Sequence, residues 1–314
     1  MQERDFQQVI VRSQIPRRSS TGYPRSFVAD PCHETVGPNR MLTPEDPKRS
    51  TTFTFNAAAD AYDNSALAFR DYFGRRTVEK LGICEGSRVL DVCCGTGSSA
   101  IPAAELVGTS GFVIGIDLAE RLLALAREKA RQRALQNIAF RAADMLELDY
   151  RVESFDVVLC VFGIFFVPDM PAAVRQLWRL VRPGGKFAIT TWGRNVLEPA
   201  NSVFWRSVRE LRSELPKPSN PWDRIADPES LRQMLREGGV EADEVIAENK
   251  WHPIRSPEDW WAIVQGSGRR GALEQLAPIE VTIVKDTNLA FVRDRRITRL
   301  ETNALLAIAT KKSN

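Results

Sequence analysis

The feature that most constrains this chain is an apolar segment that runs directly into a glycine-rich turn, Arg88-Val-Leu-Asp-Val-Cys-Cys-Gly-Thr-Gly97. Gly95 and Gly97 can adopt positive φ and bring bare backbone close to a ligand. The small and apolar residues over 98–107 are typical of a helix packed on a sheet. Together these residues predict a buried strand, a turn and a helix that form a nucleotide-cofactor pocket.

Strand-like and helix-like segments alternate along the following part of the chain, which predicts an α/β fold with a doubly wound parallel sheet. Later segments predict a helix, a long strand, a second helix and a last strand, over 228–238, 240–251, 257–265 and 303–310. The earlier strands are predicted near 88–92, 112–116, 138–142, 155–161 and 186–192, and the earlier helices near 98–107, 119–134 and 170–181.

The glycine turn alone is ambiguous, because Gly95-Thr-Gly-Ser-Ser-Ala100 also fits the dinucleotide-binding fingerprint. Asp91 argues against a dinucleotide. A carboxylate four residues before the first glycine would place negative charge near a pyrophosphate. An aminoacyl cofactor instead offers an ammonium group that an acid stabilises.

The pattern Asp91-x-x-x-Gly95-x-Gly97 resembles the first motif of class I S-adenosylmethionine-dependent methyltransferases. The segment 55–63 resembles the entry helix of the methyltransferase type 11 branch, which includes ubiquinone- and menaquinone-biosynthesis enzymes. Further matching segments follow in order over 112–117, 143–145, 155–162 and 180–186, and the resemblance covers about 53–192. It implies S-adenosylmethionine as cofactor and a Rossmann-like, mostly parallel seven-stranded sheet with helical lid insertions, in which the last strand is antiparallel.

Residues 1–50 mix prolines, serines and charges without hydrophobic periodicity, which predicts a poorly ordered N-terminal extension. Residues 51–314 are then one methyltransferase domain. The regular alternation breaks where prolines and tryptophans accumulate, so lid insertions are predicted at about 193–227 and 256–298.

The resemblance also implies roles for individual residues. Asp91 is expected to hold the methionine ammonium, and Asp117 to accept both ribose hydroxyls. Leu118 packs on adenine in this interpretation, while Asp144 and the Met145 amide bind the polar edge of that base. For each acid, a helix cap or a strand-end salt bridge is the structural alternative. The predicted cofactor-binding residues are Tyr62, Asp91, Cys93, Gly95, Thr96, Gly97, Asp117, Leu118, Asp144, Met145, Val161 and Phe162.

The segment 161–168 stands where resembling nucleic-acid amino-methyltransferases carry an Asp/Asn-Pro-Pro-aromatic motif, and its different sequence disfavours DNA amino-methylation. Aromatic residues predict an apolar wall for the methyl acceptor. His252 is the candidate general base because its pKa range suits proton abstraction, although a structural histidine is the alternative. The predicted substrate-binding residues are Phe165, Phe166, Trp192 and Trp222.

Composition narrows the class of substrate. The net charge of +3 and the pI near 8.6 come from dispersed charges, which gives no footprint for nucleic acid. Five cysteines and two histidines without metal-ligand spacing predict neither a zinc site nor a disulfide framework, as in a cytoplasmic protein. No apolar run approaches the roughly 20 residues of a membrane span.

We therefore expect transfer of a methyl group to a small, aromatic or quinone-like metabolite, by a monomer or homodimer. The acceptor atom is carbon or oxygen, and nitrogen stays open. The alternatives are an RNA or protein methyltransferase and a non-catalytic S-adenosylmethionine-binding module, because one fold hosts many functions.

Overall fold

The computed structural model describes residues 47–215 and 220–313. The predicted poorly ordered extension over 1–50 lies outside the described residues except for its last four. These four residues form the first turn of helix α2 (Pro47–Tyr62), so the folded domain begins earlier than the predicted residue 51.

A seven-stranded sheet with the order β3-β2-β1-β4-β5-β9-β6 forms the centre of the domain. The strands from β1 to β5 pair in parallel, and β9 is antiparallel to both β5 and β6. This confirms the predicted mostly parallel seven-stranded sheet with an antiparallel last strand. The strands are β1 (Arg88–Val92), β2 (Phe112–Asp117), β3 (Ile138–Ala142), β4 (Phe155–Val161), β5 (Val181–Trp192), β6 (Glu244–Glu248) and β9 (Ala304–Thr310).

The central strands β1 and β4 are buried on both faces, which explains their nearly continuous apolar sequences. Their register places Val92 opposite Cys160, so the two strands end side by side. The turns that follow contain non-glycine residues with positive φ, Cys93 at 59° and Phe162 at 57°. Such conformations cost free energy and concentrate at functional sites.

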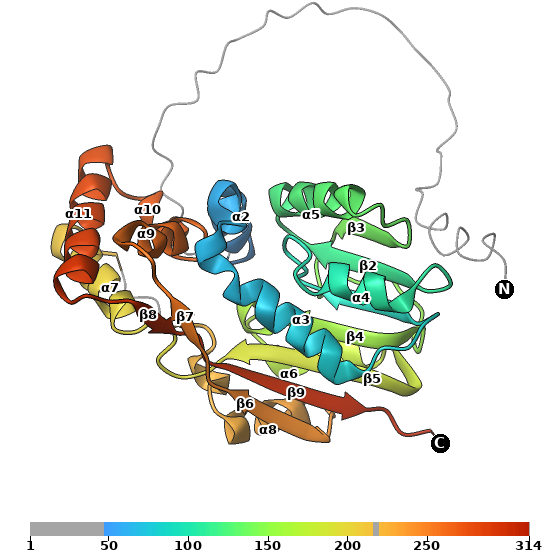
Figure 1. Cartoon of the computed structure of the whole chain (residues 1–314). Helices are drawn as coiled ribbons and strands as arrows, with labels where there is room; N and C mark the ends of the chain where they lie inside the picture. Colours follow the sequence, from blue (N-terminus) through green and yellow to red (C-terminus); the bar gives the residue numbers. More distant parts are fainter. Residues whose placement is uncertain (1–46, 216–219, 314) are drawn as a thin grey trace, which may run out of the picture. The chain divides into compact units, whose positions relative to one another are not determined.

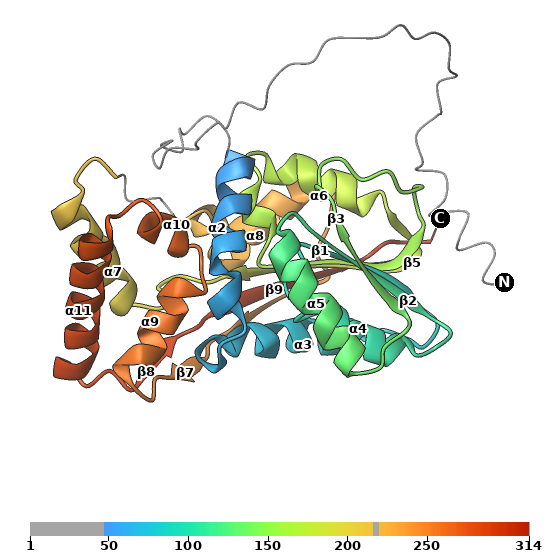
Figure 2. The ribbon, with the colours of Figure 1, turned by 90° about the horizontal axis from the view of Figure 1, so that it is seen from above.

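Helices cover both faces of the sheet (Figure 2). One face carries α3 (Phe69–Leu81), α4 (Ala100–Val107) and α5 (Glu120–Gln132), and the other carries α6 (Met170–Trp178) and α8 (Pro228–Glu237). Helix α5, which lies within the predicted range 119–134, buries an apolar stripe that consists of Leu122, Leu123, Ala126 and Ala130.

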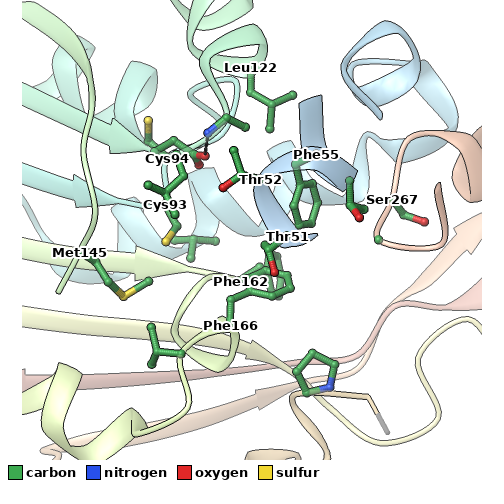
Figure 3. A pocket seen from close by; sticks show the side chains of 18 of the residues that line it. Thr51, Thr52, Phe55, Cys93, Cys94, Leu122, Met145, Phe162, Phe166 and Ser267 are labelled. Carbon is green, nitrogen blue, oxygen red and sulfur yellow. Dashed lines mark hydrogen bonds between the residues drawn. The ribbon is translucent and has the colours of Figure 1, made fainter. Parts of the chain in front are cut away.

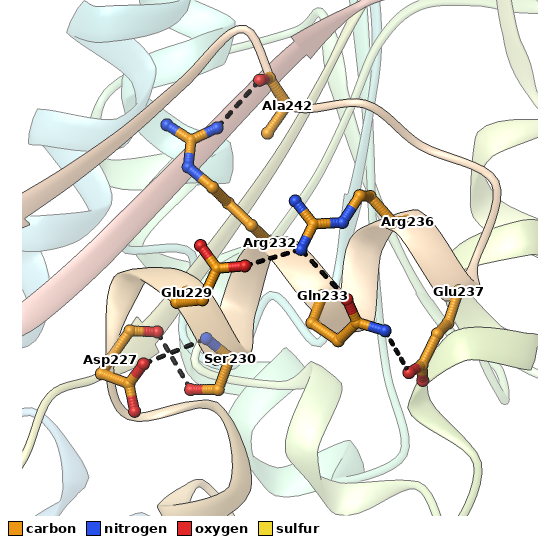
Figure 4. A network of polar contacts seen from close by, with 8 residues as sticks. All are labelled: Asp227, Glu229, Ser230, Arg232, Gln233, Arg236, Glu237 and Ala242. Atoms are coloured by element: carbon orange, nitrogen blue, oxygen red, sulfur yellow. Dashed lines mark hydrogen bonds and ion pairs between the residues drawn. The ribbon is translucent and has the colours of Figure 1, made fainter.

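Helix α8 shows how local sequence fixes an element (Figure 4). The Asp227 side chain accepts a hydrogen bond from the Ser230 backbone N–H at 3.0 Å and caps the first turn. Later in the helix, Arg236 donates to Glu229 and Gln233 at 2.7 and 3.0 Å. The cap defines where the helix begins, and the proline that follows it favours the first turn.

A group of helices lies beyond the carboxyl ends of the parallel strands, next to α2 (Figure 1). It consists of α7 (Ala200–Leu211), α9 (Pro257–Gln265), α10 (Arg270–Leu273) and α11 (Pro278–Asp294), all from the segments predicted as lid insertions. A buried chain of hydrogen bonds joins three of them: Trp260 Nε1 donates to Asn288, whose amide donates to Ser207.

The prediction of a single strand over 240–251 is wrong, because this segment contributes to two strands in different sheets. Strand β6 ends at Glu248, and β7 (Trp251–Pro253) pairs with β8 (Arg299–Glu301) in a separate two-stranded sheet. Between them, the Lys250 carbonyl accepts from the Thr302 N–H at 2.8 Å, which draws the chain away from the main sheet.

Several boundaries also differ from the predicted ones. For example, α4 starts at Ala100, β5 starts at Val181, and α6 ends at Trp178. The described residues also form three single-turn helices: η1 (Ser65–Leu67), η2 (Ile164–Phe166) and η3 (Asp223–Ile225). Over the described part of the chain, no helix has the length and apolar character needed to span a membrane.

Candidate functional site

A cavity of about 540 Å³ lies at the carboxyl ends of the parallel strands. Its walls come from the turn after β1, the ends of β2 and β4, helix α2 and parts of both predicted insertions. Figure 3 shows Cys93 and Met145 on one side of this cavity, with Phe55 and Ser267 on the other. One cavity therefore joins the predicted cofactor turn to the predicted aromatic wall.

The turn after β1 is held by backbone hydrogen bonds. The Cys94 N–H donates to the Ile116 carbonyl at 2.9 Å, and the Gly97 N–H donates to the Cys94 carbonyl at 2.8 Å. Gly95 and Gly97 have φ values of 54° and 87°, a region that favours glycine. The turn is thus fixed to the end of β2, and its residues Cys93, Cys94 and Thr96 line the cavity.

Asp91 lies beneath this turn and is fully buried. Its Oδ2 accepts from the Ser99 hydroxyl at 2.7 Å, whereas its Oδ1 has no partner among the described residues. Burial raises the pKa of the Asp91 carboxyl to about 7, against the opposing effect of the Ser99 hydrogen bond. A buried carboxylate oxygen without a partner fits the ammonium that the resemblance implies.

Asp117 stands at the end of β2, on the cavity wall. Its Oδ2 accepts from the Gly95 N–H and its Oδ1 from the Ala119 N–H, both at 2.9 Å. Burial raises its pKa, and these backbone donors oppose the shift. Because each carboxylate oxygen has a second acceptor position, Asp117 can hold the turn in place and still accept from a diol.

Asp144 forms an ion pair that was not predicted from the sequence. Lys48, from the first turn of α2, forms an ion pair with Asp144, and the Leu146 N–H donates to the same carboxylate at 2.9 Å. Lys48 falls in the segment predicted to be poorly ordered. The predicted adenine contact of Asp144 must therefore be made beside Lys48.

Tyr62 ends α2 and lies over the turn. A Cβ built on Gly95 would be 3.2 Å from the Tyr62 hydroxyl oxygen, so glycine leaves room for the ring. The Arg70 guanidinium carbon lies 4.1 Å from the Tyr62 ring centroid, within the range of a cation–π contact. Arg70 also lines the cavity, and its Nη1 is buried without a partner in the described residues. No sequence pattern singled out Arg70 as a site residue.

Aromatic side chains form another part of the cavity lining. Phe162 and Trp192 stack with ring centroids 3.5 Å apart and planes inclined by 7°. Phe55 meets Phe166 edge to face at 5.3 Å. These rings therefore form an apolar aromatic wall, to which Phe162 contributes although it was predicted as a cofactor-binding residue.

The predicted residues fall into two groups. Those that line the cavity are Tyr62, Cys93, Thr96, Asp117, Leu118, Asp144, Met145, Val161, Phe162, Phe166, Trp192 and Trp222. Those outside its lining are Asp91, Gly95, Gly97, Phe165 and His252. Phe165 packs behind the wall, 4.8 Å from Phe166 and 5.5 Å from Trp222 between ring centroids.

The geometry does not support His252 as a general base. Its ring is buried on β7 and meets Phe69 at 5.1 Å, and Phe69 in turn meets Trp192 at 5.8 Å between centroids. Two aromatic rings thus separate the imidazole from the cavity. Burial also lowers the pKa of His252. The structural alternative fits this histidine better.

The chain is similar to known methyltransferases. A family model described as a methyltransferase domain matches residues 83–250. The demethylmenaquinone methyltransferase of Lactococcus lactis subsp. lactis is 30% identical over 209 residues, which are 60% of this chain and 81% of that protein. The aklanonic acid methyltransferase of a Streptomyces species is 35% identical over 144 residues, which are 46% and 66% of the two chains.

A solved structure, the YcgJ protein from Bacillus subtilis, shares the fold with a TM-score of 0.53 at 16% identity, over 77% of this chain and 100% of that one. The family match spans the turn, Asp91, Asp117 and Asp144. It confirms the expected enzyme class and its cofactor. The chain therefore belongs to the methyltransferase domain family, as a class I S-adenosylmethionine-dependent methyltransferase of the ubiquinone- and menaquinone-biosynthesis type.

Proposed function

We propose that this protein transfers the methyl group of S-adenosylmethionine to a small aromatic or quinone-like metabolite, at a carbon or oxygen atom, with nitrogen as the less favoured acceptor. The observation that carries this proposal is a single cavity lined both by the cofactor turn and by aromatic rings. Cys93, Thr96 and Asp117 line it on the cofactor side, and Phe55, Phe162 and Trp192 supply its aromatic surface.

The similar proteins support a small acceptor. Their names give demethylmenaquinone and aklanonic acid as the molecules that they methylate. A cavity enclosed by helix α2 and segments near α7 and α10 suits such molecules better than an exposed groove would.

On the cofactor side, Asp91 is buried behind the cavity lining, and its unpartnered Oδ1 would stabilise the methionine ammonium. Arg70, with a buried unpartnered Nη1, and the neighbouring Tyr62 are suited to the methionine carboxylate. The second acceptor positions of Asp117 suit the ribose, and Met145 and Leu118 offer apolar surface to the adenine.

When bound, S-adenosylmethionine supplies a methyl group that its sulfonium already activates. The chain then has to orient the acceptor and exclude water. The stacked pair of Phe162 and Trp192 provides a fixed surface for an aromatic acceptor. No histidine lines the cavity in the described ranges, so we assign catalysis to positioning rather than to proton abstraction by a histidine.

The test of this function begins with binding. Calorimetry on the full chain should show S-adenosylmethionine or S-adenosylhomocysteine at one site per chain, without comparable binding of NAD. Asp91 is the physical reason, since its carboxylate disfavours a pyrophosphate and stabilises an ammonium. Tighter binding of NAD would contradict the assignment.

The acceptor is then sought by incubating the enzyme with S-adenosylmethionine and a panel of quinones, phenols and aromatic acids. Mass spectrometry should detect S-adenosylhomocysteine and a product heavier by one methyl group. Turnover confined to RNA or protein substrates would contradict a small acceptor.

Cofactor binding should depend on pH through Asp91. Its pKa of about 7 means that the free enzyme holds this carboxyl protonated at lower pH. A bound ammonium favours the charged form, so binding releases a proton and affinity rises with pH up to about 7. We expect the affinity for S-adenosylhomocysteine to increase roughly tenfold between about pH 5.5 and 7.5. In Asp91→Asn, calorimetry should show a flat profile, and an unchanged slope would exclude Asp91 from this linkage.

A further inference from the structure

Arg269 is a buried cation in the wall of the same cavity. It stands between α9 and α10, lines the cavity, and is only 7% exposed. Trp260 lies beside it, with the guanidinium carbon 5.5 Å from the ring centroid. Charged side chains are seldom buried this deeply without a partner of opposite charge.

The contacts of Arg269 leave part of its guanidinium unused. Nε and Nη2 donate to the Asn201 side-chain oxygen at 3.0 and 2.6 Å, and Nη1 donates to the Ser267 hydroxyl at 3.3 Å. A guanidinium has five N–H donors, so one on each terminal nitrogen has no acceptor in the described part of the chain.

No carboxylate among the described residues forms an ion pair with Arg269. The charge of Glu198 acts on Arg269, and Asn201 contacts both residues, since its amide nitrogen donates to Glu198 at 3.0 Å. Asp117 and Asp144 line the same cavity, but each has other partners near the cofactor turn. The positive charge of Arg269 is thus only indirectly compensated.

A second guanidinium increases this excess of positive charge. Arg70 lines the same cavity and also has a buried nitrogen without a partner in the described residues. Burial first, and then the charge of Arg70, lower the pKa of Arg269 to about 10, so it remains a cation at neutral pH. An anion in the cavity would relieve both the burial cost and the repulsion.

We propose that Arg269 binds a negatively charged oxygen of the methyl acceptor, which is either a carboxylate or an ionised hydroxyl. The inference rests on the proposed function and specifies its substrate class. The two unused N–H groups belong to a rigid planar fork that suits an oxyanion. An acceptor bound as its anion has already lost its proton to water, which agrees with a cavity to which the described residues contribute no histidine.

The test compares acids with neutral molecules of the same shape. The full chain, saturated with S-adenosylhomocysteine, is titrated with naphthoate and naphthamide, and then with hydroxynaphthoquinone and its methyl ether. We expect the acid of at least one pair to bind at least roughly tenfold more tightly, as charge-assisted hydrogen bonds imply. A preference in the first pair identifies a carboxylate, and in the second an ionised hydroxyl. No preference in either pair, including no binding at all, would overturn the proposal.

Variants assign the preference to Arg269. In Arg269→Gln, the affinities for the acid and its neutral partner should differ by no more than about twofold, while the affinity for S-adenosylhomocysteine is unchanged. Arg206→Gln is the matched control because this arginine is exposed on α7, and it should keep the wild-type preference. A folded Arg269→Gln protein that still prefers the acids would contradict the inference.

A spectroscopic measurement on the wild-type protein covers the case in which Arg269→Gln does not fold. Bound hydroxynaphthoquinone should show the absorbance of its ionised form at a pH where the free compound is still protonated. If neither acid is preferred in the titrations and the bound hydroxynaphthoquinone is neutral at that pH, the proposal is overturned. Failure of S-adenosylhomocysteine itself to bind would instead disprove the proposed function.

Discussion

Replacing Asp117 by alanine is expected to lower the affinity for S-adenosylhomocysteine by roughly 10²- to 10⁴-fold. Two hydrogen bonds from ribose hydroxyls to a charged acceptor contribute about 1.5–3 kcal/mol each. The same carboxylate accepts from the Gly95 N–H, so its removal also loosens the turn. Calorimetry on the folded variant measures the loss.

Asp156 provides the matched control for Asp117. It is also half-buried at the end of a strand, and it accepts from the Arg88 N–H at 2.7 Å and from the Arg182 side chain. It lies at the amino end of β4, away from the cavity. Asp156→Ala should lower stability and leave cofactor affinity unchanged. Equal losses of affinity in both variants would mean that Asp117 acts only through the fold.

A methyl group at Gly74 should damage both stability and cofactor binding. Gly74 lies in α3, and a Cβ there would be 2.4 Å from the Ser98 carbonyl oxygen and 3.0 Å from the Ser99 nitrogen. Because these atoms are backbone, α3 or the turn must move. We expect Gly74→Ala to lower the free energy of unfolding by about 1–3 kcal/mol, together with a large loss of affinity for S-adenosylhomocysteine.

Gly268→Ala is the corresponding control in an open position, since no atom of the described residues lies within 4 Å of a Cβ built there. Its free energy of unfolding should be unchanged or slightly higher, because alanine restricts the unfolded chain. Denaturant titration of the two variants measures the contrast. A Gly74→Ala protein as stable as the wild type would show that α3 does not pack on the turn as described.

The sheet was predictable because its signals are local. A strand such as β1 is a short apolar run that ends at glycines, and α5 repeats its apolar residues at helical spacing. The segment after β6 was not predictable in this way. The carbonyl of Lys250 is drawn toward Thr302, a partner 52 residues later that no local pattern reveals.

Cofactor-side residues were partly predictable because several occupy strand ends, where parallel strands place their side chains at one edge. Arg70 and Arg269 are nearly 200 residues apart, and only the packing of α2, α3 and the late helices brings them to one cavity. Their significance depends on burial without a carboxylate partner. A single sequence does not contain that information, and the same reason explains why His252 looked suitable as a base.

The register between β1 and β4 determines how the cofactor turn and the aromatic wall lie relative to each other. Val92 lies opposite Cys160, so the cofactor turn and the aromatic wall both begin from this one pair. A slip by one residue would displace one reactant from the other by about 3.3 Å. Misplacement of reacting groups by about 1 Å can lower the rate about 10²-fold. The buried valines of these strands therefore maintain the alignment of the two reactants as well as the fold.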